Sequence, residues 1–177
     1  MNSQSNTSNK SRLVLLYSCA LVIVLLDRVT KFLSDTNLSE GSPVPVFPGF
    51  DLLLAYNTGA AFSFLGDAGG WQRWFLTAIS FGVSIFIAIW LAKLPRSQKL
   101  LSIALVLILG GAVGNLYDRA LAGYVIDFIS VYFGQWRFAT FNIADSAISV
   151  GAALMVLDIF LDWKNDPESE NGKNSAS

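Results

Sequence analysis

Four long apolar segments constrain the fold of this 177-residue chain more than any other feature. The segments cover residues 13–33, 74–92, 100–117 and 141–161. Each approaches the roughly 20 helical residues that cross a hydrocarbon core about 30 Å thick. Hydrophobic residues make up 53% of the chain and charged residues 14%, which is too apolar for an ordinary soluble domain. We therefore predict an all-α polytopic membrane protein, a single integral membrane domain over residues 1–177, with disordered tails at residues 1–11 and 165–177.

The first apolar segment also has features of a cleavable signal peptide. Lys10 and Arg12 precede it, and residues 16–19 resemble a lipobox that ends at Cys19, the one cysteine of the chain. Apolar residues continue for seven positions beyond Cys19, however, and no polar mature region follows. We therefore expect an uncleaved signal-anchor helix.

The distribution of basic residues predicts the orientation in the membrane. Lys10 and Arg12 precede the first segment, and Lys93, Arg96 and Lys99 lie in or beside the short connection between the second and third. Cytoplasmic loops of membrane proteins carry an excess of Lys and Arg. This rule places the N-terminus and the connection in the cytoplasm, and four spans then return the C-terminus to the same side.

The two remaining connections, residues 34–73 and 118–140, are then extracytoplasmic, and both contain strand-like patterns. Residues 50–56 follow a predicted turn, and residues 128–138 contain two short runs rich in aromatic residues. We expect these runs to form a small β-sheet cradle on the outer membrane surface. Aromatic side chains in this region suit the headgroup layer of the membrane, namely Phe47, Phe50, Tyr56, Tyr132, Phe133 and Trp136.

Missing residue types exclude several kinds of active site. The chain has no histidine and one cysteine, which removes the Cys-His dyad, the Ser-His-Asp triad, histidine-ligated zinc and any disulfide framework. The net charge of −1 gives no indication of nucleic-acid binding, and neither a metal nor a cofactor is indicated. Any chemistry must therefore use Asp, Asn, Arg, Ser, Thr or Lys.

Asp127 and Asp145 are the strongest candidates for catalysis. Both lie beside or inside membrane-length apolar segments, where a lipid-facing charge costs on the order of 3 kcal/mol and an acid usually marks a functional site. The connection between the third and fourth segments allows the two acids to meet at one depth. Two carboxyl groups about 3 Å apart share a proton, so that one activates water while the other protonates a carbonyl oxygen.

Both acids also have structural interpretations. Asp145 lies three residues after Asn142, a pattern typical of a capped helix start, and Asp127 on its own fits an ordinary loop. Arg119 fits either a surface ion pair with Asp118 or a group that bridges the carboxylates or holds a lipid phosphate.

Other polar and small residues near the segment ends fit more than one role. Asn115 lies within the third segment and needs a hydrogen-bond partner, for which a catalytic carboxylate is a candidate. Asp27 lies near the end of the first segment. One interpretation makes this block simply the outer end of the first helix, with Arg28 and Lys31 extending to the membrane interface, but Asp27 is harder to explain in this way than the two bases. Residues 110–114 contain a small-xxx-small pattern, which is typical of close helix packing.

Four sequence blocks resemble the lipoprotein signal peptidases, the type II signal peptidases of bacteria. The blocks are residues 27–31, 57–63, 110–128 and 141–146. The resemblance implies an intramembrane aspartic endopeptidase that removes the signal peptide from diacylglyceryl-modified prolipoproteins, just before the lipidated lipobox cysteine. It implies Asp127 and Asp145 as the catalytic dyad. Residues that match the surroundings of the dyad in the family are Asp27, Asn57, Gly59, Asn115, Arg119 and Asn142.

The resemblance also implies a place and partners. It points to the bacterial inner membrane, with the active site toward the outer leaflet and with lipidated prolipoprotein signal peptides and membrane lipid as partners. We expect the protein to act as a monomer. Arg28 departs from the family pattern, which commonly has Gln there, and this affects only the surroundings of Asp27.

Two other classes of protein use similar residues. A small proton-coupled transporter also needs intramembrane acids, but transporters place the coupling carboxylate near the bilayer midplane, whereas these acids lie at segment ends. A noncatalytic membrane scaffold has no need for two paired acids together with Arg119 and two asparagines at one depth in the membrane.

Overall fold

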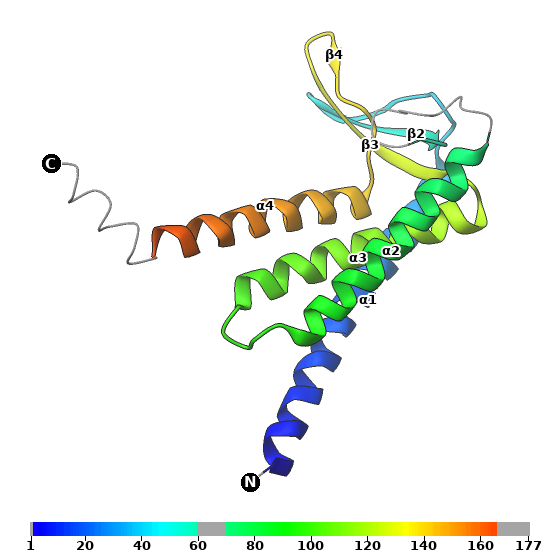
Figure 1. Cartoon of the computed structure of the whole chain (residues 1–177). Coiled ribbons are helices and arrows are strands. Elements are labelled where there is room, and N and C mark those ends of the chain that lie inside the picture. Colours follow the sequence, from blue (N-terminus) through cyan, green and yellow to red (C-terminus); the bar gives the residue numbers. More distant parts are fainter. Residues whose placement is uncertain (1, 60–69, 166–177) are drawn as a thin grey trace, which may run out of the picture.

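Four helices and a four-stranded antiparallel sheet make up the computed structural model, which describes residues 2–59 and 70–165 (Figure 1). The helices are α1 (Asn2–Asn37), α2 (Trp71–Lys93), α3 (Lys99–Leu121) and α4 (Ile143–Lys164). The strands are β1 (Val44–Phe47), β2 (Phe50–Asn57), β3 (Val125–Phe133) and β4 (Trp136–Arg137). Each helix contains a stretch long and apolar enough to cross a membrane, so the predicted four spans and small sheet are confirmed.

Helix α1 begins earlier than the sequence predicts. Residues 2–11 are helical where we expect a disordered tail, and the apolar span within α1 covers Asn9–Asn37. Once a helix is nucleated, each further residue adds a backbone hydrogen bond at little cost, so a long apolar helix extends into a polar stretch. The expected C-terminal tail beyond Asn165 lies outside the described residues.

Helix α3 is the centre of the helix bundle and packs against each of the other three helices. Within its most apolar stretch 61% of the residues are buried, compared with 11% to 17% in the other helices. Leu105 and Leu109 of α3 form a core with Leu91 of α2 and Ala20 of α1. Many large apolar side chains of α1, α2 and α4 are exposed, as expected for helices surrounded by lipid.

Glycines in α3 allow its close contacts with α1 and α4. A Cβ atom added at Gly110 would lie 2.7 Å from a side chain of α1, and one at Gly114 would lie 2.7 Å from Oδ2 of Asp27. A Cβ atom at Gly111 would overlap a backbone carbonyl oxygen of α4. The small-xxx-small pattern therefore marks close helix packing, as predicted.

The sheet lies at the end of the bundle where α3 ends and α4 begins (Figure 1). Its strands run in the order β1-β2-β3-β4, and each neighbouring pair is antiparallel. In the β2–β3 register, Ala55 lies opposite Asp127. A bridge between Ile129 of β3 and Phe141 holds the chain just before α4. This arrangement brings Asp127 next to the start of the helix that carries Asp145.

Two features of the sheet differ from the sequence-based expectation. Strand β1 is not among the predicted strands. All four of its residues are exposed, so it has no alternation of buried and exposed positions, and Pro45 lacks a backbone donor. As an edge strand, β1 tolerates that loss. Strand β3 begins at Val125, so Asp127 lies in a strand rather than in a loop. The predicted turn at Pro48 and Gly49 is confirmed, with a φ of 93° at the glycine.

Candidate active site

Asp127 lies in β3 and is almost completely buried, with 2% of its surface exposed. Its Oδ2 atom accepts a hydrogen bond of 3.1 Å from the side-chain amide of Asn57 in β2. Its Oδ1 atom accepts one of 2.7 Å from the side-chain amide of Asn142, the residue before α4. Strand pairing and the helix start thus fix the orientation of this carboxyl group.

Asp145 lies in the first turn of α4 and forms a capping box with Asn142. The Oδ1 atom of Asn142 accepts a hydrogen bond of 2.9 Å from the backbone N–H of Asp145, and Oδ2 of Asp145 accepts one of 3.2 Å from the backbone N–H of Asn142. The Oδ1 atom of Asp145 accepts a further bond of 2.7 Å from Nδ2 of Asn115 in α3. Asp145 therefore has the structural role of a helix start, and Asn142 contacts both acids.

The environment of Asp127 favours its protonated form. Burial, and then the negative charge of nearby Asp145, raise the pKa of Asp127 from the ordinary value of 3.8 to about 6. Hydrogen bonds from Asn57 and Asn142 and the positive charge of Lys31 oppose this shift without cancelling it. A carboxyl group with such a pKa can hold or release a proton near neutral pH.

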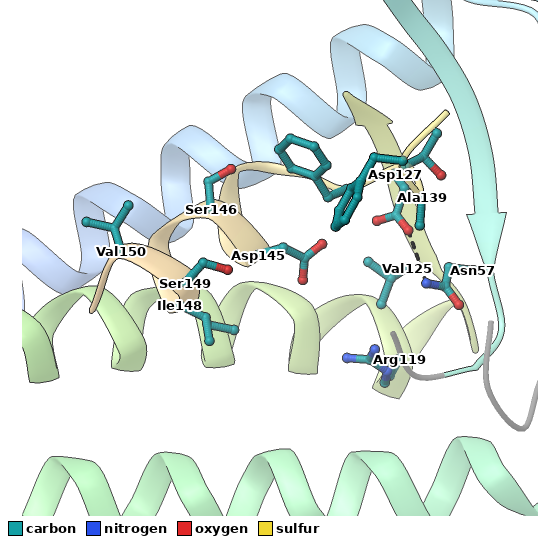
Figure 2. A pocket seen from close by; sticks show the side chains of 13 residues that line it. Asn57, Arg119, Val125, Asp127, Ala139, Asp145, Ser146, Ile148, Ser149 and Val150 are labelled. Atoms are coloured by element: carbon teal, nitrogen blue, oxygen red, sulfur yellow. Dashed lines mark hydrogen bonds between the residues drawn. The ribbon is translucent and has the colours of Figure 1, made fainter. Parts of the chain in front are cut away.

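Both carboxyl groups line one cavity of about 540 Å³ (Figure 2). Figure 2 shows Asp127 approaching this space from β3, Asp145 from α4 and Arg119 from α3. The other lining residues are mainly apolar and comprise Asn57, Val125, Phe138, Ala139, Thr140, Phe141, Ser146, Ile148, Ser149 and Val150. We call this space the apolar cavity. It offers two acids to a largely hydrophobic ligand.

Arg119 lines the apolar cavity but forms no ion pair with either acid or with Asp118 within residues 2–59 and 70–165. The interpretation of Arg119 as the partner of Asp118 is therefore wrong. Its Nη2 group donates a hydrogen bond of 3.4 Å to the backbone oxygen of Gly59, whose N–H donates to Oδ1 of Asn57 at 3.0 Å. Its Nε atom has no hydrogen-bond partner in the described part of the chain. Arg119 thus retains donor capacity for a bound molecule.

Comparisons with known proteins decide the family. The model of the family described as signal peptidase (SPase) II matches residues 19–161. The chain belongs to this family. A lipoprotein signal peptidase of Hydrogenovibrio crunogenus is 51% identical over 80% of this chain and 82% of its own length, and one of Shigella boydii is 52% identical over 80% and 86%. A solved bacterial membrane enzyme, determined by the in meso method at 2.3 Å resolution, is 30% identical with a TM-score of 0.78, over 87% of this chain and 92% of that one.

Family membership confirms that the chain is a signal peptidase and hence a protease. Together with the four apolar helices, it indicates a multi-pass protein of the bacterial inner membrane. Nothing in the comparisons favours the transporter alternative, and a noncatalytic scaffold does not agree with membership of an enzyme family.

This signal peptidase also has a buried lysine where sequence patterns predict an interfacial one. Lys31 has 0% of its surface exposed, so the interpretation in which it extends to the membrane interface is wrong. Its ammonium group forms ion pairs of 2.8 Å with Asp27 and with Asp118. It also donates a hydrogen bond of 2.9 Å to Oδ1 of Asn115. The four-residue spacing of Asp27 and Lys31 is the sequence signal for this pair, because it places both on one helix face.

Asp27 of α1 supports the first turn of α4, the turn that carries Asp145. It is completely buried, and its Oδ1 atom accepts a hydrogen bond of 2.9 Å from the backbone N–H of Ala144. This bond satisfies one of the N-terminal donors that a helix leaves free. Arg28, which departs from the family pattern, pairs with Asp118 and lies over the ring of Tyr117 at 4.4 Å.

The structure brings most of the predicted site residues of this signal peptidase together. Four of them line the apolar cavity, namely Asn57, Arg119, Asp127 and Asp145. Asn115 and Asn142 contact the acids, and Gly59 contacts Arg119. Asp27 accepts a hydrogen bond from the backbone N–H of Ala144, beside Asp145. Residues 60–63 of the sequence block 57–63 lie outside the described residues. In the described ranges, no group of three or more His, Cys, Asp or Glu residues is arranged to hold a metal ion.

Proposed function

We propose that this signal peptidase removes the signal peptide from diacylglyceryl-modified prolipoproteins, cleaving just before the lipidated cysteine, with Asp127 and Asp145 as its catalytic dyad. Relatives named lipoprotein signal peptidase, which are 50% to 52% identical over most of the chain, support the substrate class. One observation carries the catalytic assignment. Both carboxyl groups line the same cavity, and Asn142 holds both of them.

In the proposed mechanism one acid is ionised and the other protonated, because two adjacent carboxyl groups do not both ionise easily. The ionised acid takes a proton from a water molecule, whose oxygen attacks the carbonyl carbon before the lipidated cysteine. The protonated acid gives its proton to the carbonyl oxygen, which produces a tetrahedral intermediate. The C–N bond then breaks: one acid gives its proton to the cysteine nitrogen, and the other takes a proton from one hydroxyl group of the intermediate, which leaves a carboxyl group on the signal peptide and restores the dyad.

Neighbouring groups position the dyad and the substrate. The amides of Asn57, Asn115 and Asn142 donate hydrogen bonds to the carboxylate oxygens. Arg119 adds a positive charge beside the cavity and an Nε donor that has no partner in the described residues. The apolar lining suits the hydrophobic signal peptide and the lipid attached to the cysteine.

We also propose that the apolar cavity faces the outer leaflet and that both chain ends are cytoplasmic. Arg12, near the start of α1, donates hydrogen bonds of 2.8 Å to the backbone oxygen of Leu94 and 2.9 Å to the hydroxyl of Ser102. The basic residues of the N-terminus and of the α2–α3 connection thus gather at one end of the bundle, as the positive-inside rule expects of the cytoplasmic side. We further propose that the protein acts as a monomer in contact with membrane lipid.

The test is cleavage of a purified diacylglyceryl-modified prolipoprotein by the detergent-solubilised protein. The same prolipoprotein without lipid is the substrate control. Asp127→Asn and Asp145→Asn keep the side-chain shape but cannot exchange the proton, so we expect both folded variants to lose cleavage. Substantial turnover by either variant would remove that acid from the mechanism. A folded wild type that leaves the lipidated substrate intact would contradict the substrate assignment.

A further inference from the structure

A second cavity meets the apolar cavity at Asp127. It has a volume of about 360 Å³, and its lining comprises Ala55, Tyr56, Asn57, Asp127, Arg137, Ala139 and Thr140. Four of these residues also line the apolar cavity, namely Asn57, Asp127, Ala139 and Thr140. The carboxyl group of Asp127 therefore lies where two cavities join.

The lining of this second space, which we call the Arg137 cavity, is the more polar of the two. Arg137 of β4 is held by an ion pair of 2.7 Å with Asp51 of β2 and by a hydrogen bond to Ser130 of β3. Its guanidinium carbon also lies 5.1 Å from the ring centroid of Tyr132. Three strands thus hold one cation at the edge of the cavity. The bulky apolar residues line only the apolar cavity, namely Val125, Phe138, Phe141, Ile148 and Val150.

Hydrolysis of a peptide bond consumes one water molecule in each turnover, and this water must reach the acids while substrate is bound. An apolar cavity filled by a signal peptide and its lipid offers water no route, because a buried water needs about two to four polar partners. Arg137, Asn57 and Thr140 supply such partners in the Arg137 cavity. The volume of about 360 Å³ also far exceeds the roughly 15 Å³ that one water requires.

We propose that the Arg137 cavity is the water-entry site of this signal peptidase and supplies the attacking water to Asp127 and Asp145 while substrate fills the apolar cavity. The inference rests on the proposed catalytic role of these two acids. Arg137 and Thr140 position water at the sheet, and the junction at Asp127 passes it to the dyad.

Ala55 offers a way to narrow the Arg137 cavity alone. It lies opposite Asp127 in the β2–β3 register, and directly opposed Cβ atoms of antiparallel strands lie about 4.5–5.5 Å apart. Ala55 lines the Arg137 cavity but not the apolar cavity. A larger side chain at this position therefore obstructs the water side of Asp127 and leaves the substrate side unchanged.

The test measures kcat and KM on the lipidated prolipoprotein for Ala55→Ser, Ala55→Val and Ala55→Leu. We expect kcat to fall with side-chain size, by about tenfold or more for Leu, while KM stays within about twofold of the wild type. Ala55→Ser is the matched control, because its side chain is small and polar and leaves the route open. Thermal unfolding of each variant checks the fold. Thr140→Val, which keeps the size and removes the hydroxyl group, should also lower kcat and introduces no bulk.

Two results would overturn the proposal. A rise in KM with unchanged kcat in Ala55→Leu would mean that the Arg137 cavity holds part of the substrate. Unchanged kcat in the folded Ala55 variants and in Thr140→Val would mean that water arrives by another route. Failure of the catalytic assignment is distinguishable, because Asp127→Asn would then retain cleavage whatever the Ala55 variants do.

Discussion

Lys31 donates a hydrogen bond of 2.9 Å to the Oδ1 atom of Asn115, which lies 84 positions further along the chain. An ammonium group carries donors only, so the amide oxygen of Asn115 must face Lys31. The Nδ2 group of Asn115 then faces Asp145, to which it donates a hydrogen bond of 2.7 Å. The lysine therefore fixes the orientation of an amide that holds one of the two proposed catalytic acids.

Replacing Lys31 by Met should destabilise the protein strongly. The change removes the shared partner of Asp27 and Asp118 in a buried site, and breaking a buried ion pair in this way costs about 3–5 kcal/mol. Denaturant unfolding in detergent measures the loss. Adding Asp27→Asn to Lys31→Met should recover part of it, because the second change removes an unpaired charge. A double variant that is no more stable than Lys31→Met alone would contradict the ion-pair argument.

Substitutions of Asn142 should separate its two roles. Asn142→Ala removes both the amide donor to Asp127 and the acceptor that caps α4, whereas Asn142→Ser removes only the donor. We expect both variants to lose most peptidase activity, and Asn142→Ala alone to lose about 1 kcal/mol of stability through the missing cap. Cleavage assays and denaturant unfolding on the same preparations check both effects. Full activity in Asn142→Ser would show that the amide contact to Asp127 is dispensable.

The four spans and the two acids could be predicted because their signals are local. A span depends on about 20 consecutive apolar residues, and an acid inside such a segment is visible from the sequence alone. The family resemblance then supplied the polar residues around the dyad. Asn57 and Asn142, predicted in this way, donate hydrogen bonds to Asp127 in the structure.

The burial of Lys31 and the presence of β1 could not be predicted in this way. A lysine near the end of an apolar helix has the pattern of a residue that extends to the interface, and its burial depends on Asp118 and Asn115 of a helix distant in sequence. Strand β1 has no alternation of buried and exposed residues and contains Pro45. It forms through its pairing with β2, which is a tertiary contact.

The raised pKa of Asp127 predicts a pH-dependent stability. Its value is about 6 in the folded protein against an ordinary 3.8, so the native state binds more protons than the unfolded state between these values. The contribution of this group to stability therefore falls as the pH rises through that window, by an amount of the order of 3 kcal/mol, and is level above it. Asp127→Asn lacks this titration. As the pH rises from about 4 to 7, the unfolding free energy of Asp127→Asn should therefore increase relative to that of the wild type. A difference between the two proteins that stays constant over this range would contradict the raised pKa.

Close packing of α3 predicts opposite effects for two Gly→Ala substitutions. A Cβ atom at Gly111 would overlap the backbone carbonyl oxygen of Ala144, and α4 cannot yield without moving the turn that carries Asp145. Such overpacking costs about 1–3 kcal/mol, and we expect Gly111→Ala to lower peptidase activity as well.

Gly82 of α2 is the matched control, because no atom lies within 4 Å of its added Cβ. Gly82→Ala should leave activity unchanged and stabilise by up to about 1 kcal/mol through helix propensity. Equal unfolding free energies for the two variants would show that the α3–α4 contact does not require glycine.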